Sequence, residues 1–156
     1  MKYVFDACTF IVLGHYFPER FPSFWKNLDD YVSRGKIISV REVFKELDNN
    51  ASKLHLRTWI DQNKRIFLTP GAKEMEFVSR IFSIPKYQHM VEVKKRLKGT
   101  PVADPFVIAS AKIRGACVVT EEEKKKDASK IPNVCEYFDI ECTNLESFME
   151  KEHWQF

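Results

Sequence analysis

Acidic residues stand at four separate points of the sequence where side chains could carry chemistry: Asp6, Glu42 with Glu46, Asp104, and Glu121 with Glu122. Asp6 directly follows the apolar segment KYVF, and Glu121 directly follows another apolar segment, ACVVT. Glu42 and Glu46 are four residues apart, so a helix would place both on one face. Carboxylates that are brought together repel and raise one another's pKa unless a cation joins them. If these acids converge, they predict a cation-binding site.

The residue types favour a hard divalent cation. The four histidines lack the spacing of a zinc site, and the four cysteines include no C-x-x-C pair. Two of the cysteines lie in strand-like apolar segments, where reduced thiols behave as small hydrophobes, so we expect no disulfide framework. Carboxylate oxygens remain as donors, and they suit Mg²⁺ or Mn²⁺ rather than zinc. One such ion lowers the pKa of a bound water, and two can clamp the attacking and leaving oxygens of an in-line phosphoryl displacement. The chemistry predicted is therefore phosphodiester cleavage.

Short apolar segments alternate with helical patterns, and these elements must position the acids. Strands are predicted at residues 2–5, 36–40, 65–69, 116–120 and 139–143. Helices are predicted at residues 22–33, 40–49, 53–62, 73–83, 87–98, 104–114 and 144–152, and an exposed loop or lid at 124–132. Because strands that alternate with helices form βαβ crossovers, we expect an α/β fold. Its three layers, α/β/α, would enclose a mostly parallel central sheet of about four or five strands.

In a parallel sheet the carboxyl ends of the strands lie at one edge, where binding sites form. Asp6 and the acids after residue 120 end two of the predicted strands. The helix that begins at Asp104 leads into strand 116–120, so its first residue should lie at the same edge. Glu42 and Glu46 occupy the first turns of the helix that leaves strand 36–40. We therefore expect all four groups of acids to face one crevice.

Each acid also has a structural explanation. Asp6 could cap the helix that starts near Cys8, and Asp104 followed by Pro105 has the form of a helix start. Thr120 and Glu123 have the spacing of a capping box. Two glutamates on one helix face are common where that face is solvated. Capping alone, however, would not require every one of these positions to be acidic, because Ser, Thr and Asn cap helices as well.

Composition limits the classes of protein. At 156 residues, with 44% hydrophobic and 30% charged residues, the chain is predicted to form a single globular domain, 1–156. The formal net charge of +3 permits a polyanionic partner without requiring one. The apolar start of the chain is short and is interrupted by Asp6, and no long apolar span follows. We therefore expect neither a signal peptide nor a membrane partner, and a cytoplasmic location.

The chain resembles the PIN-domain ribonucleases, in particular the toxin halves of VapBC-like toxin–antitoxin pairs. The matching segments are YVFDACTFI, ISVREVFKEL, ADPFVIASA and VVTEEE. The tail, from IPNVCEYF to the end, is similar to a less-characterised PIN-like subgroup that is often found beside a helix-turn-helix partner gene. The resemblance implies a PIN-like fold and an Mg²⁺- or Mn²⁺-dependent endoribonuclease, the toxin of a type II pair. It also implies an RNA substrate, a cognate antitoxin of which a helix-turn-helix protein is one form, and a homodimer.

Carried onto this sequence, the catalytic and metal-binding quartet of the family is Asp6, Glu46, Asp104 and Glu122. Glu42 stays open as an alternative to Glu46, and Glu121 as an alternative to Glu122, because the family usually has Thr-x-Asp where this chain has Thr-Glu-Glu. Cys8 stands where the family more often has Ser or Asn. Thr9 and Thr120 are therefore the hydroxyls expected to support the acids.

Two basic clusters flank the acids in the sequence: Lys94, Lys95, Arg96 and Lys98, and Lys124, Lys125 and Lys126. Such residues could hold the phosphates on either side of the scissile one, although charge runs also occur on ordinary solvated surfaces. Two other functions stay open. One is a PIN-fold module that binds RNA or protein without catalysis. The other is an Asp-based phosphatase or receiver, whose further aspartates do not match this sequence.

Overall fold

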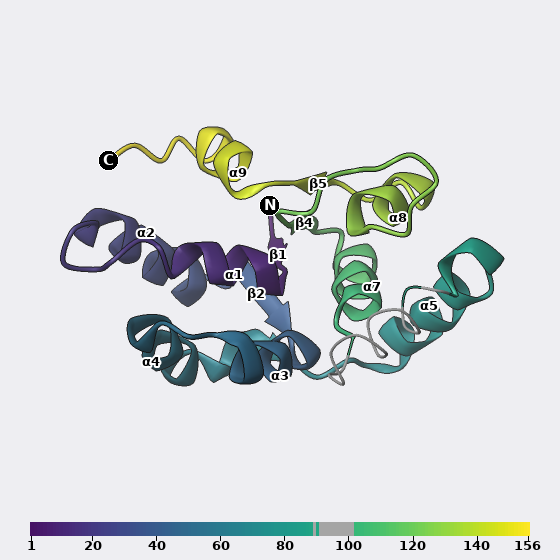
Figure 1. Cartoon of the computed structure of the whole chain (residues 1–156), viewed down its shortest axis with the longest axis horizontal. Coiled ribbons are helices and arrows are strands. Elements are labelled where there is room, and N and C mark those ends of the chain that lie inside the picture. Colours follow the sequence, from purple (N-terminus) through teal and green to yellow (C-terminus); the bar gives the residue numbers. More distant parts are fainter. Residues whose placement is uncertain (89, 91–101) are drawn as a thin grey trace.

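A parallel five-stranded sheet lies at the centre of the protein (Figure 1). The structure is a computed structural model that describes residues 1–88, 90 and 102–156. The strand order is β3-β2-β1-β4-β5. The strands are β1 (Tyr3–Phe5), β2 (Ile37–Val40), β3 (Phe67–Leu68), β4 (Cys117–Val119) and β5 (Cys142–Thr143). All four neighbouring pairs are parallel, with β1 at the centre. The predicted α/β/α architecture with a five-stranded parallel sheet is confirmed.

Helices follow most strands and cover the sheet. The α-helices are α1 (Ala7–Leu13), α2 (Pro22–Ser33), α3 (Arg41–Asn50), α4 (Leu54–Gln62), α5 (Ala72–Phe82), α7 (Asp104–Arg114), α8 (Ile131–Tyr137) and α9 (Leu145–Lys151). The described part of the chain also contains the short 3-10 helices η1 (Lys64–Ile66) and η2 (Pro85–Tyr87). In Figure 1, α1 and α2 lie on one side of β1 and α7 lies on the other. Within the described ranges, no helix has the length and apolar character needed to span a membrane.

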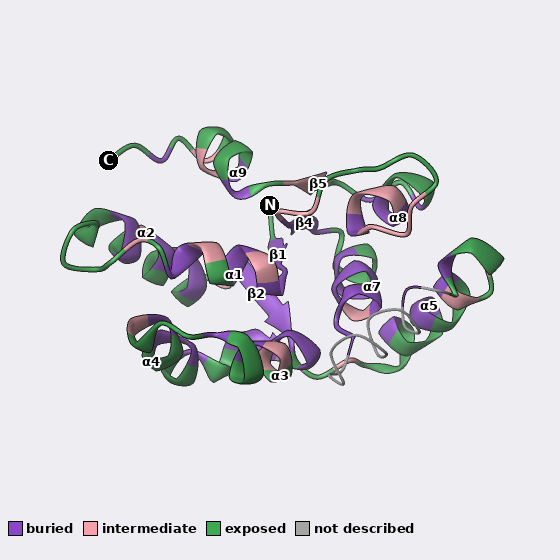
Figure 2. Cartoon of the chain, viewed as in Figure 1, coloured by how far each residue is buried: buried purple, intermediate pink, exposed green. Residues whose placement is uncertain are grey.

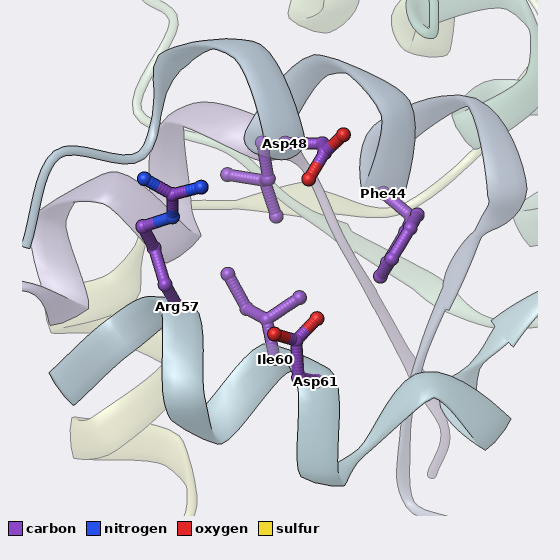
Figure 3. A pocket seen from close by; sticks show the side chains of 6 residues that line it. Phe44, Asp48, Arg57, Ile60 and Asp61 are labelled. Carbon is purple, nitrogen blue, oxygen red and sulfur yellow. The ribbon is translucent and has the colours of Figure 1, made fainter. Parts of the chain in front are cut away.

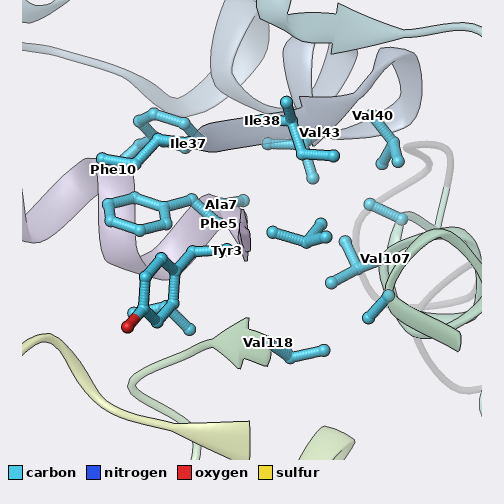
Figure 4. Close-up of a cluster of buried hydrophobic side chains, with 14 of the residues drawn as sticks. Tyr3, Phe5, Ala7, Phe10, Ile37, Ile38, Val40, Val43, Val107 and Val118 are labelled. Carbon is cyan, nitrogen blue, oxygen red and sulfur yellow. The ribbon is translucent and has the colours of Figure 1, made fainter. Parts of the chain in front are cut away.

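The two faces of β1 pack against different kinds of side chain. Figure 4 shows Tyr3, Phe5 and Phe10 on one side of the strand and Val107 of α7 on the other. The rings of Tyr3 and Phe5 lie 4.7 and 5.3 Å from that of Phe148 in α9. Figure 2 shows that β1 and the facing side of α7 are buried. Alternation of side chains along a strand explains this division, and it fixes β1 between two packed layers.

The register of the sheet brings the ends of β1 and β4 to the same level. Phe5 pairs with Val119, and the Asp6 N–H continues the ladder by donating to the Val119 carbonyl at 3.0 Å. The Ser39 hydroxyl ties β2 to the same strand by donating to the Phe5 carbonyl at 2.7 Å. The first residues beyond three neighbouring strands are therefore held close together.

The structure corrects several predicted boundaries. Residues 65–69 were expected to form one strand, but η1 occupies their first part and only Phe67–Leu68 pair with β2. The expected loop at 124–132 ends earlier, because α8 begins at Ile131, whose side chain is fully buried with Val134 and Cys135. Most of the predicted helix 87–98 lies outside the described residues.

The capping explanations of the acids are also tested by the structure. Asp6 precedes α1 but its side chain makes no capping hydrogen bond. Asp104 is the first residue inside α7, and Ala103 occupies the capping position. No helix starts at Thr120, because residues 120–130 form a loop. Capping therefore does not account for the acids at these three positions.

Candidate active site: an acidic cleft at the carboxyl ends of the strands

A cleft of about 320 Å³ opens at the carboxyl edge of the sheet. Its lining residues are Asp6, Ala7, Cys8, Ile11, Glu46, Asn50, Asp104 and Glu122. The four acids come from four parts of the chain: the end of β1, the middle of α3, the start of α7 and the loop after β4. The structure thus brings together the four positions predicted as the quartet, whose roles as ligands remain predictions. Asn50 and Ile11 were not predicted, although Asn50 follows Glu46 at helical spacing.

Asp6 is almost fully buried, and the side chains of Thr120 and Cys8 help to orient it. The Thr120 hydroxyl and the Cys8 thiol each donate to Asp6 Oδ2 at 3.0 Å. Thr120 is itself buried at the end of β4, whereas Cys8 is partly exposed on the first turn of α1. One carboxylate oxygen of Asp6 therefore receives donors from two different elements.

Backbone amides complete this arrangement. The Glu122 N–H donates to Thr120 Oγ1 at 3.2 Å, and the Glu121 N–H donates to Cys8 Sγ at 3.3 Å. Thr9, the other hydroxyl expected to support the acids, instead donates to the Val119 carbonyl at 2.9 Å. Thr9 therefore holds α1 against β4 and contacts no carboxylate of the cleft through this bond.

The two glutamates of the cleft each accept a backbone amide from the start of another helix. Glu46 Oε1 accepts the Ala103 N–H at 3.1 Å, just before Asp104. Glu122 Oε2 accepts the Ile131 N–H at 2.9 Å, at the first residue of α8. The first bond joins α3 to the start of α7, and the second joins the loop that carries Glu122 to the start of α8.

The alternative glutamates occupy other places and do not line the cleft. Glu42 is 4% exposed, and its Oε1 accepts Arg41 Nη2 at 3.0 Å, while its Oε2 has no hydrogen-bond partner among the described residues. Glu121 Oε1 accepts the Leu145 N–H at 2.8 Å, at the first residue of α9. In each pair, therefore, the second glutamate faces the cleft and the first does not.

The thiol of Cys8 is a donor at neutral pH. Its burial, and then the negative charge of Asp6, raise the pKa of Cys8 to about 12. The protonated thiol can therefore donate to the Asp6 carboxylate, and it is not available as a thiolate nucleophile.

The donor set of the cleft fits a hard cation. Among the described residues, no three His, Cys, Asp or Glu side chains form a group that could by itself hold a metal ion. Mg²⁺ does not require such a cage, because it keeps several waters and binds through one or two carboxylates together with substrate phosphate. Four carboxylates around a space of about 320 Å³ leave room for an ion with its waters. The cleft is thus chemically suited to Mg²⁺ or Mn²⁺.

The loop after Glu122 carries the second of the predicted basic clusters. Lys124 forms an ion pair with Glu136, whereas Lys125 and Lys126 have no ion pair within the described residues. Asn133 fixes the loop by accepting the Lys125 N–H at 3.2 Å and donating to the Lys125 carbonyl at 2.6 Å. The first cluster, Lys94, Lys95, Arg96 and Lys98, lies outside the described residues.

A second hollow, between α3 and α4, is much smaller, at about 30 Å³. Figure 3 shows the Arg57 guanidinium and the carboxylates of Asp48 and Asp61 around it, with Phe44 and Ile60 beside them. Its size admits little beyond a water molecule, so the acidic cleft is the better candidate site.

Comparisons with known proteins identify a matching family model and solved structures with a similar fold. The family model described as "Domain of unknown function (DUF4411)" matches residues 3–156. A chain in the crystal structure of VapBC2 from Rickettsia felis, bound to a DNA fragment from their promoter, aligns with a TM-score of 0.50 and 15% identity, covering 92% of this chain and 98% of that one. PAE2754 from Pyrobaculum aerophilum aligns with a TM-score of 0.47 and 14% identity, covering 99% and 91%. No curated protein sequence matches. The likeness to VapBC2 confirms a PIN-domain, VapC-like fold.

Proposed function

The chain belongs to the DUF4411 family, a domain of unknown function, and we propose that it is an Mg²⁺- or Mn²⁺-dependent endoribonuclease. The observation that carries this proposal is the convergence of Asp6, Glu46, Asp104 and Glu122 on one cleft of about 320 Å³. Four like charges in one cleft are unfavourable without a cation. Helix capping does not explain Asp6, which makes no capping hydrogen bond, or Asp104, which lies inside α7. The VapC-like fold supports a nuclease of the hydrolase class.

The residues of the cleft would divide the work as follows. Asp6 and Asp104 are buried, which keeps their carboxylates in fixed positions, so we assign them as the main ligands of the ion. Glu46 and Glu122 would bind the ion or orient its waters while anchoring the starts of α7 and α8. When bound, Mg²⁺ or Mn²⁺ would activate a water for attack and neutralise charge on the phosphoryl oxygens. The chain's own contribution is to hold the four carboxylates in place before the substrate arrives.

The RNA backbone would enter along the basic loop. Lys125 and Lys126 project from a segment that begins beside Glu122, and the backbone of this segment is fixed by Asn133. Lysines bind phosphates without reading bases, so these contacts would position RNA rather than select its sequence. The lysines and arginine of the 94–98 cluster are proposed for the same role from the sequence alone.

We also propose that the nuclease is the toxin of a type II toxin–antitoxin pair. VapBC2, the neighbour with a TM-score of 0.50, is a complex bound to DNA from its own promoter. By analogy, the partner of this chain would be an antitoxin of the VapB kind, with a helix-turn-helix protein as one form, and the chain could pair as a homodimer. Co-purification with the product of the neighbouring gene tests this part separately from catalysis.

The catalytic proposal is tested by incubating the purified full chain with single-stranded RNA and Mg²⁺ or Mn²⁺. We expect cleavage that EDTA abolishes, and loss of cleavage in both Asp6→Asn and Asp104→Asn, since each removes one charge at nearly constant size. If both variants cut as well as the wild type, the proposed site is wrong. If the partner-free protein cuts no RNA with either ion, the enzyme proposal fails.

A second candidate is a PIN-fold module that binds RNA or protein without catalysis. One observation favours it, because Glu46 and Glu122 each already accept a backbone amide that helps hold the fold together. The binding module would retain RNA in a filter or gel-shift assay with Mg²⁺ present and leave it intact. Binding together with cleavage supports the nuclease.

A further inference from the structure

Two parallel chains of hydrogen bonds end on one oxygen of Asp6. The first runs from the Glu122 N–H to the Thr120 hydroxyl and on to Asp6 Oδ2, over 3.2 and 3.0 Å. The second runs from the Glu121 N–H to the Cys8 thiol and on to the same Oδ2, over 3.3 and 3.0 Å. We propose that the Cys8 thiol is a positioning residue of the site, which holds the Asp6 carboxylate in its cation-binding orientation by relaying the Glu121 amide.

The direction of each bond follows from counting protons. A thiol or hydroxyl has one proton to donate and lone pairs to accept with. The Glu121 amide can only donate, so the Cys8 sulfur must accept there. Ionised Asp6 can only accept, so the single thiol proton points at Oδ2. Although Cys8 Sγ and Thr120 Oγ1 are 3.3 Å apart, the proton of each is already used on Asp6, so this contact adds no donor.

The relay connects α1 to the loop after β4, and the cleft can bind a cation only if these two segments stay at a fixed distance from each other. Cys8 lies on α1, two residues after Asp6, whereas the Glu121 amide lies in the loop that follows β4, beside Glu122. The sulfur therefore fixes the position of the loop that supplies Glu122 relative to the carboxylate of Asp6. Partners that orient metal-binding side chains contribute about 10- to 100-fold to metal affinity or activity.

A catalytic role for the sulfur itself is a weaker reading. Among the described residues, the side chains that hydrogen-bond Cys8 Sγ are those of Asp6 and Thr120. Neither is an imidazole or an amine that would stabilise a thiolate nucleophile. Cys8 is also partly exposed in the lining of the cleft, so it is close enough to support the acids without being a core residue. What the position needs is one proton and one acceptor, which serine also offers.

This inference rests on the proposed cation site, so its test includes a readout that needs no cation. We compare wild type with Cys8→Ala, Cys8→Ser and a control, Cys142→Ala, which removes a half-buried thiol from β5 outside the relay. Mn²⁺ binding is titrated calorimetrically on the full chain. Hydrogen exchange of the Glu121 amide is measured by NMR without metal, and thermal unfolding reports whether each variant is folded.

We expect Cys8→Ala to weaken Mn²⁺ binding by about 10-fold or more and to speed exchange at the Glu121 amide. Cys8→Ser should restore both, and Cys142→Ala should change neither. The proposal is overturned if Cys8→Ala is folded and binds Mn²⁺ like the wild type, or if Cys8→Ser is as impaired as Cys8→Ala. If Cys8→Ala does not fold, the comparison of Cys8→Ser with wild type decides by the same criteria.

The two proposals can fail independently. If the wild type binds no Mn²⁺, the proposed function fails, and the exchange rate of the Glu121 amide still decides whether the thiol forms the relay. If Mn²⁺ binds normally while exchange at Glu121 is unchanged in Cys8→Ala, the cation site stands and the relay is refuted.

Discussion

At the amino end of β1, both carboxylate oxygens of Glu152 accept hydrogen bonds from neighbouring side chains. Tyr3 donates its hydroxyl to Glu152 Oε1 at 2.5 Å, and Tyr31 donates to Glu152 Oε2 at 2.6 Å. Burial raises the pKa of Glu152, but the two phenol hydrogen bonds and the charge of Lys36 outweigh this effect and leave the pKa below its usual value. One charge, two donors and a nearby cation make this a structural acid that joins the end of α9 to β1 and α2.

The carboxyl end of the same strand carries a carboxylate in different surroundings. The Cys8 thiol and the Thr120 hydroxyl both donate to Asp6 Oδ2. Three more carboxylates, from Glu46, Asp104 and Glu122, line the same space. The difference teaches that burial and hydrogen bonding alone do not identify a chemical site. The distinguishing feature is like charge gathered from separate elements around an open volume.

The strongest test of this contrast is the response to a cation. If Mn²⁺ binds the cleft, a concentration near 100 times its dissociation constant should stabilise the wild type by about 2.7 kcal/mol. That corresponds to a rise in melting temperature of about 5–10 °C for a chain of this size. Asp6→Asn should abolish the rise, and Glu152→Gln should retain it. Differential scanning calorimetry with and without Mn²⁺ measures both, and an equal rise in all three proteins would remove the basis for distinguishing the two ends.

The second test separates the two glutamates of α3. Glu46 lines the cleft, whereas Glu42 is paired with Arg41 beside it. We expect Glu46→Gln to lower RNA cleavage by about 10- to 100-fold and Glu42→Gln to leave it near the wild-type rate. Single-turnover kinetics at saturating Mg²⁺ measure the chemical step. An inactive Glu42→Gln protein beside an active Glu46→Gln protein would reverse the assignment.

The third test concerns the structural acid. Glu152→Gln removes the charge that accepts the two phenol hydrogen bonds. We expect a loss of about 1 kcal/mol in the free energy of unfolding, because the group is only partly buried and solvent screens its charge. Urea denaturation measures this loss. Cleavage of RNA well below the melting temperature should be unchanged, and a strong loss of activity in a folded protein would connect the two ends of β1.

The same network predicts a dependence on pH. Because the pKa of Glu152 is lower in the folded chain than its usual value of 4.5, the folded state binds fewer protons than the unfolded state in this range. Its stabilising contribution is therefore complete above pH 4.5 and is lost as the pH falls through the folded pKa. Wild type should lose more stability than Glu152→Gln between neutral pH and that range. Parallel curves for the two proteins would contradict the assignment.

Much of the fold was predictable because its signals are local. The predicted helices 22–33 and 104–114 agree with α2 and α7 residue for residue, since each has a proline in its first two positions. The helix α8 was missed because its seven residues begin with Ile131-Pro132 after a lysine-rich run that has the composition of a loop. Ile131, Val134 and Cys135 have helical spacing, but three residues are too few to predict a helix, and their burial is seen only in the folded structure.

The sequence was enough to predict which acids line the cleft, but not the hydrogen bonds that hold them. The chain order of strands and helices was enough to expect Asp6 and Asp104 at one edge. Whether Glu121 or Glu122 faces the cleft depends on side-chain direction after β4, which no periodicity encodes in a loop. In the structure the Leu145 N–H at the start of α9 donates to Glu121, whereas Glu122 lines the cleft. The thiol relay through Cys8 was equally hidden, because it depends on a contact between residues 8 and 121.

The smallest expected effect concerns the lysines of the loop after Glu122. As with the acids, one charge here has a structural partner and others are proposed to bind substrate. Lys124 is engaged by Glu136, whereas Lys125 and Lys126 have no ion pair within the described residues. A Lys125→Ala, Lys126→Ala double variant should raise KM several-fold with kcat unchanged, because phosphate contacts bind substrate and transition state alike. The slope of log affinity against log salt for single-stranded RNA should fall by about 1.4, or about 0.7 for each lost phosphate contact. Lys124→Ala is the matched control, and an equal loss of slope in the control would show that the loop acts through general charge rather than through its two unpaired lysines.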